Sequence, residues 1–99
     1  MARTLRSFSA RFRVVEQRLA DVVRRGVSDD RAAYFADVVA AHVAMADLYR
    51  EARDAAVGDI GGIVWSALYD AEQVHRAEAR ELERFAAKVA LSDAAGTAA

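Results

Sequence analysis

The chain has 99 residues, of which 55% are hydrophobic, with no proline, no cysteine and a net charge of −1. This length makes one small domain, the lack of cysteine excludes disulfides and thiolate metal sites, and the lack of proline leaves long helices possible. No apolar run approaches the ~18–20 residues of a membrane span, and the N-terminal arginines precede no signal-peptide core, so we expect a soluble, cytoplasmic protein.

The first predicted helix covers about residues 4–25. Its apolar residues recur at intervals of three and four, which is typical of a helix with one buried face. They are Leu5, Phe8, Phe12, Val15, Leu19 and Val22. Residues 1–26 carry seven arginines against two acidic residues, a charge of +5, whereas residues 27–99 carry −6.

This basic, amphipathic segment bears on the possible partners. Residues 1–26 could lie on an anionic membrane surface, but the acidic remainder of the chain offers a counter-charge, so we favour docking of the helix on its own protein. We expect no nucleic-acid partner, because the net charge is slightly negative and no nucleic-acid-reading motif is present.

The rest of the chain predicts a long antiparallel helical hairpin over about residues 28–91. Ser28 or Asp29 can cap its first arm, and three glycines in residues 58–62 mark the turn. The apolar stripe of the first arm is Phe35, Val38, His42, Met45, Tyr49, Ala52 and Ala56. The stripe of the second arm is Val64, Leu68, Ala71, His75, Glu78, Leu82, Phe85 and Val89. Residues 92–99 lack bulky apolar side chains, which predicts a flexible tail.

The expected fold is all-α, with three helices in one domain over residues 1–91. Each arm of the hairpin, at about 28–30 residues, is about 45 Å long, whereas a compact domain of this size is only ~35 Å across. Such a rod leaves apolar sides uncovered. We therefore expect a homo-oligomer that forms a four-helix or larger bundle, or a small subunit of a larger protein assembly.

The only two histidines of the chain lie in these stripes, one on each arm. If the turn centres near residue 60, His42 lies opposite Glu78; if the second arm starts at Asp59, His42 faces His75. Glu72 stands three residues before His75, so the two side chains share a helix face and can reach one metal ion. Imidazole and carboxylate suit iron, zinc or manganese, which makes His42, Glu72 and His75 candidate ligands.

The stretches HVAMADLYREA and WSALYDAEQVHRAEARELERF resemble ferritin-like proteins of the short encapsulated-ferritin type, over about residues 35–85. In that family a tyrosine follows the first ligand by seven residues and a Glu-x-x-His motif lies on the next helix, as Tyr49, Glu72 and His75 do here. The resemblance implies a helical hairpin that dimerises to build an iron site between two chains. If two irons bind, it implies oxidation of Fe²⁺, with Tyr49 beside the ligands.

The sequence departs from this family at the first ligand, where His42 stands in place of a glutamate. A dimer would offer two glutamates and four histidines to two Fe²⁺ ions, and Glu78 is a possible further carboxylate; a mononuclear, zinc or empty site is an alternative. The other interpretation is a non-enzymatic assembly module. Its histidines would bond to each other or to a neighbouring glutamate, Glu72 would pair with Arg76, and the polar layer would set the helix register.

Overall fold

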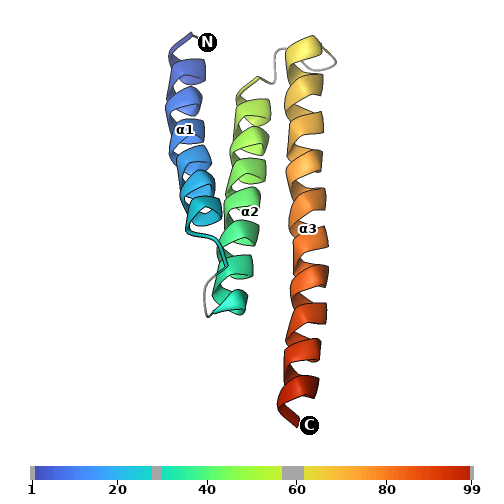
Figure 1. The fold of residues 1–99 in the computed structure, drawn as a ribbon. Helices are drawn as coiled ribbons and strands as arrows, with labels where there is room; N and C mark the ends of the chain where they lie inside the picture. Colours follow the sequence, from blue (N-terminus) through green and yellow to red (C-terminus); the bar gives the residue numbers. More distant parts are fainter. Residues whose placement is uncertain (1, 28–29, 57–61, 99) are drawn as a thin grey trace.

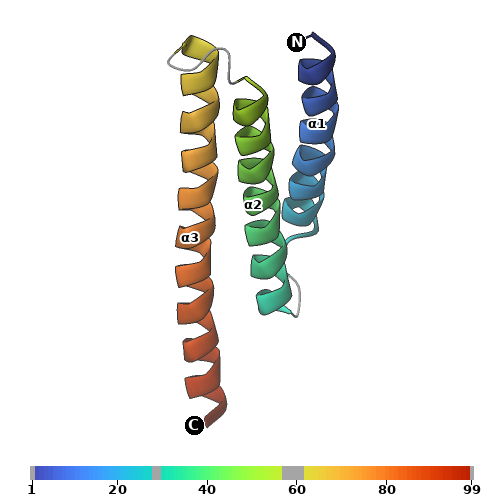
Figure 2. The same cartoon turned by 180° about the vertical axis from the view of Figure 1, so that it is seen from behind.

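The computed structural model describes residues 2–27, 30–56 and 62–98. These residues form three helices: α1 (Ala2–Arg25), α2 (Arg31–Ala55) and α3 (Ile63–Ala98). The helices run alternately down and up, side by side, with α2 between α1 and α3 (Figures 1 and 2). No strand occurs in the described ranges, so the predicted all-α fold of three helices is confirmed.

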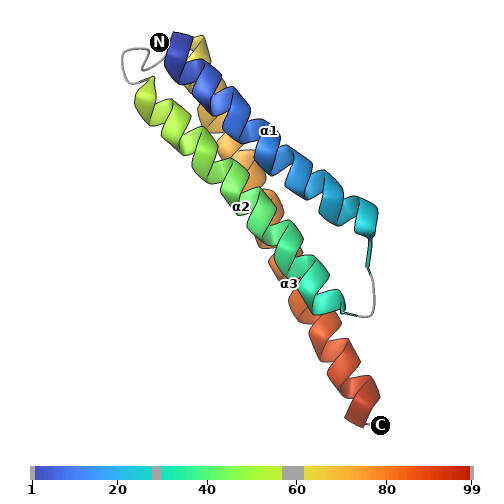
Figure 3. The ribbon, with the colours of Figure 1, turned by 90° about the vertical axis from the view of Figure 1, so that its left-hand side faces the viewer.

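The three helices form one thin layer. The Cα positions extend 59 × 24 × 13 Å, so the arrangement is long and flattened, although its smallest extent is larger than the ~4.6 Å Cα diameter of a single helix. Viewed from the side, α1 and α2 lie next to each other in front of α3, and the C-terminal part of α3 extends beyond both other helices (Figure 3). A layer of this kind has broad faces and little interior.

Local signals explain where α1 ends and α2 begins. Gly26 adopts a φ of +71°, a left-handed conformation that favours glycine, and its N–H donates to the Val22 carbonyl at 3.1 Å. Asp30 caps α2, because its carboxylate accepts a hydrogen bond from the Ala33 N–H at 2.9 Å. The predicted caps, Ser28 and Asp29, lie outside the described residues; the capping carboxylate is the one directly before Arg31.

One cluster of buried apolar residues lies between α1 and α2. Val15 packs with Met45 and Leu48, and further apolar residues surround them: Phe8, Phe12, Ala44 and Tyr49. Two alanines of α2, Ala41 and Ala46, are 0% exposed, so the neighbouring side chains pack directly on the helix at these points. No large side chain in the described residues is fully buried, which leaves the core of a single chain shallow.

The stripe of α3 is less buried than the sequence predicts. Val64, Glu78 and Phe85 are exposed, and the remaining stripe residues are half-buried: Leu68, Ala71, His75, Leu82 and Val89. The buried residues described on α3 are instead Glu72 and Ala79. Helix α3 is therefore rotated so that α2 covers one edge of the stripe and leaves the other edge uncovered.

The C-terminal segment is helical. Helix α3 continues through residues 92–98, for which a flexible tail is predicted, and Arg31 pairs with Asp93 at 3.2 Å. The side chains of residues 91–96 are exposed, as expected for a segment without bulky apolar residues. Among the residues described, no helix is both long enough and apolar enough to span a bilayer.

Candidate functional site

The two histidines meet between α2 and α3. The Nδ1 atoms of His42 and His75 are 3.0 Å apart, their ring centroids are 5.2 Å apart, and both residues are half-buried. Of the two predicted arrangements, the structure has the one in which His42 faces His75 rather than Glu78. Helix α3 begins at Ile63, and Asp59, the alternative start, lies outside the described residues.

The short distance between the two Nδ1 atoms requires that one of them carries a proton and the other does not. A neutral imidazole has one N–H donor and one acceptor nitrogen, so a hydrogen bond between the two Nδ1 atoms requires opposite tautomers. One ring carries its proton on Nδ1 and donates, while the other carries it on Nε2 and accepts. The pair is therefore satisfied when both rings are neutral.

Aromatic rings connect the histidine pair to α1. Tyr49 stacks on His75 with ring centroids 5.6 Å apart and an interplanar angle of 16°, and the Phe12 ring lies 4.5 Å from the Tyr49 ring. The row Phe12, Tyr49, His75, His42 thus runs from α1 to α2, on to α3 and back to α2. Tyr49 occupies the position beside the histidines that the sequence predicts for it.

Burial and charge act on His75 in opposite directions. Removal from water lowers the pKa of His75, the nearby His42 lowers it further, and the carboxylates of Glu78 and Glu16 partly offset this. Glu78 is exposed, one turn along α3 from His75. The net result is that the His75 ring stays neutral at pH values where a solvated histidine begins to protonate.

Glu72 is directed at arginines. Glu72 is 4% exposed. One of its carboxylate oxygens accepts a hydrogen bond from Arg53, and the other accepts one from Nε of Arg76 at 2.8 Å. Arg76 also donates to Asp47 at 3.2 Å. The hydrogen bond to Glu72 raises the pKa of Arg76 above its ordinary value, so this guanidinium stays charged. The predicted pairing of Glu72 with Arg76 is present, and the carboxylate is fully engaged.

This arrangement decides how the predicted ligands fit a metal ion. His42 and His75 converge, whereas Glu72 is neutralised by two guanidinium groups. In the part of the chain that the structure describes, no group of three or more His, Cys, Asp or Glu residues could hold a metal ion. As a set within one chain, His42, Glu72 and His75 therefore do not fit an iron or zinc ion.

Sequence reasoning missed Arg53, which organises this end of the hairpin. Its guanidinium lies over the rings of Trp65 and Tyr69, at 5.7 and 5.3 Å from their centroids, and these two rings stack 5.7 Å apart. A signal was present: Arg53 follows His42 by eleven residues, about three helical turns, and so shares its face of α2. An arginine at that position needs an acidic partner on α3, and Glu72 supplies it.

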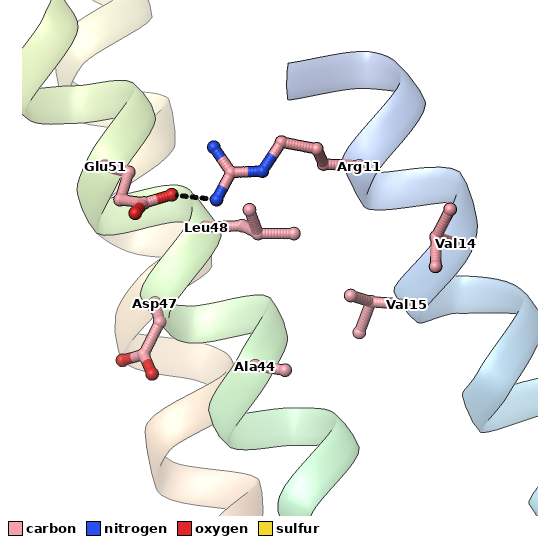
Figure 4. A pocket seen from close by; sticks show the side chains of 7 residues that line it. All are labelled: Arg11, Val14, Val15, Ala44, Asp47, Leu48 and Glu51. Atoms are coloured by element: carbon pink, nitrogen blue, oxygen red, sulfur yellow. Dashed lines mark hydrogen bonds and ion pairs between the residues drawn. The ribbon is translucent and has the colours of Figure 1, made fainter. Parts of the chain in front are cut away.

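A surface groove separates α1 from α2 (Figure 4). Its volume is about 390 Å³, and it is lined by Arg11, Val14, Val15, Ala44, Asp47, Leu48 and Glu51. The charged residues at its edge already have partners, since Arg11 pairs with Glu51 and Asp47 pairs with Arg76. The groove offers apolar walls without a pairing of nucleophile and base.

Comparisons with protein-family models, with curated proteins and with solved structures give no match to this chain. The likeness to ferritin-like proteins therefore depends only on the sequence features given above, which are the two quoted stretches and the spacing of Tyr49, Glu72 and His75 from His42.

Proposed function

We propose that the protein is a non-enzymatic helical module that assembles with copies of itself. The observation that carries this proposal is its exposed area. The chain exposes 6759 Å², whereas a compact monomer of 10.8 kDa exposes about 5,500 Å². The excess is about 1,200 Å² per chain, or about 2,400 Å² for two chains, which is the area that stable homodimers bury.

The polar groups between α2 and α3 support the same proposal. The two histidines bond to each other, Glu72 bonds to two arginines, and no buried side-chain N or O atom among the described residues lacks a partner. Satisfied polar layers of this kind oppose sliding of one helix along another, because a shifted register leaves their groups unpaired. In this proposal the histidine pair and Glu72 hold the helices in register while apolar surfaces drive association.

Self-association is tested by sedimentation equilibrium over a hundredfold range of protein concentration. We expect a mass of two or more chains at micromolar concentration, and a melting temperature that rises with concentration, because association stabilises only the folded chain. A mass of one chain throughout, with a constant melting temperature, would contradict the proposal.

A divalent metal site is the second candidate function, and the observation in its favour is the convergence of two imidazoles. Nδ1 atoms 3.0 Å apart can both lie within the ~2.1 Å that metal–imidazole bonds require. Further ligands would come from the histidine pair of a second copy, because the described residues of one chain offer no third donor beside the pair. Zinc, iron or cobalt suits such donors.

The metal candidate predicts that Co²⁺ or Zn²⁺ raises the melting temperature by mass action. We expect one bound ion per histidine pair, or one per two pairs. Bound Co²⁺ should also give visible absorption bands. His42→Ala and His75→Ala should abolish the bands, while Glu81→Gln, on the exposed surface of α3, should leave them intact. Equal metal uptake by all four proteins would show that the histidines are not ligands.

A further inference from the structure

Helix α3 carries a largely exposed face, here termed the outer stripe, in which only Ala71 is half-buried. It comprises Val64, Ala67, Ala71, Val74, Glu78 and Phe85. Val64, Val74 and Phe85 are 50%, 60% and 53% exposed. The spacings of three, four, three and four residues from Val64 to Glu78 keep these side chains in line along a helix, as in the seam of a coiled coil. The next seam position is the exposed Glu81, and Phe85 follows it.

From the outer stripe we infer that a second copy of the chain packs its own α3 against this face, antiparallel, with the twofold axis beside Val74. This inference rests on the proposed self-association and specifies its surface. The stripe spans 22 residues, about 33 Å of helix. Two such helices in contact, with flanking side chains, account for a large part of the excess area described above.

The order of side-chain sizes along the outer stripe sets the direction of packing. Its first half is small, with Ala67 and Ala71, and its second half is large, with Glu78 and Phe85. The midpoint between Val64 and Phe85 falls at Val74 and His75. An antiparallel pair about this point places Val64 opposite Phe85 and Ala71 opposite Glu78, so each large side chain meets a smaller one.

A parallel pair would be unfavourable on two grounds. It would bring Phe85 against Phe85 and Ala71 against Ala71 at the same level, which leaves a clash at one end and a gap at the other. It would also place the two Glu78 carboxylates side by side in a partly dry interface, where like charges repel strongly. The antiparallel arrangement separates them along the axis.

The antiparallel interface predicts a strong effect of charge at its centre. In a twofold interface a residue beside the axis meets its own copy, so Val74→Glu introduces two facing carboxylates. We expect dimerisation weakened by about 100-fold or more, as follows from several kcal/mol for desolvating unpaired charges. The matched control is Val14→Glu on α1, because Val14 is also 60% exposed; its dimerisation should change less than threefold. Both variants should keep the helical circular dichroism of the wild type.

A second measurement keeps the inference testable if Val74→Glu fails to fold. The chain has no cysteine, so Val74→Cys introduces a single thiol close to its symmetry mate. Under mild oxidation we expect most Val74→Cys to form a disulfide-linked dimer, because the Cα atoms at the axis come within the ~4.4–6.8 Å that a disulfide needs. Val14→Cys should stay largely unlinked.

The possible results separate the surface from the function. If the wild type is monomeric at all concentrations, the proposed self-association fails and the inference fails with it. If the wild type is a dimer, but Val74→Glu leaves its dissociation constant unchanged and Val74→Cys does not cross-link, only the α3 surface is wrong. Equal disruption by Val14→Glu would point to the groove face instead and overturn the assignment.

Discussion

Replacement of Glu72 with alanine is expected to lower the free energy of unfolding by about 3 kcal/mol, a large part of the stability of a domain this size. The carboxylate is buried between Arg53 and Arg76. Its removal leaves two guanidinium groups facing each other, one of them confined against Trp65 and Tyr69. Arg76 retains Asp47, whereas Arg53 loses its counter-charge.

Urea unfolding at pH 7 and one fixed protein concentration measures this effect. Glu72→Gln keeps the side-chain shape without the charge, so its loss should be intermediate. The matched control is Glu83→Ala, because Glu83 is an exposed glutamate of α3 away from the outer stripe; it should change stability by less than about 0.5 kcal/mol. If Glu72→Ala is as stable as the control, the ion pairs of Glu72 with Arg53 and Arg76 do not stabilise the folded chain in solution.

Acidification is expected to destabilise the protein through His75. Burial and His42 lower the pKa of His75 in the folded chain below its ordinary value of 6.5. The unfolded chain therefore takes up a proton first as the pH falls, and protons favour the unfolded state. The stability that neutral His75 contributes is present above about pH 6.5 and declines below it, until the folded-state pKa is passed.

The measurement is the urea midpoint between pH 8 and pH 5, where few carboxylates titrate. His75→Gln should flatten the decline below pH 6.5. His42→Gln should make the loss of stability below pH 6.5 smaller. It removes one of the two causes of the lowered pKa of His75, while Glu78 and Glu16 remain. Nitrogen chemical shifts should show two opposite tautomers at pH 8. If the urea midpoints of the wild type and of His75→Gln fall in parallel as the pH is lowered, His75 is not the cause of the loss of stability.

The helices, and the position of the two histidines near the same level of the hairpin, could be predicted because they depend on spacing along one chain; the choice between Glu78 and His75 opposite His42 stayed open. Apolar residues at intervals of three and four mark the buried faces of α1 and α2, and Gly26 ends α1 by its left-handed backbone. The hairpin topology then brings the middle of one arm near the middle of the other. His42 and His75 are close for this reason.

The rotation of α3 and the partner of Glu72 could not be predicted in the same way. Much of α3 is alanine, so turning it by part of a turn changes the buried apolar area little. The ion pairs of Glu72 with Arg53 and Arg76 can then decide which face meets α2. A three-residue interval shows that Glu72 and His75 share a side of the helix. It does not show which basic residue on α2 forms an ion pair with the Glu72 carboxylate.

The thinness of the layer has a consequence for how far association can proceed. Val74 and Arg76 are two residues apart, so at about 100° per residue they leave α3 on nearly opposite sides. The side of α3 that carries Arg76 is hydrated and ionic, and Asp47 lies largely exposed beside it. Covering this side would remove water from charged groups without burying apolar surface. A twofold pair that joins the apolar sides turns both ionic sides outward, which ends growth at a closed particle and opposes the endless stacking of layers into fibres.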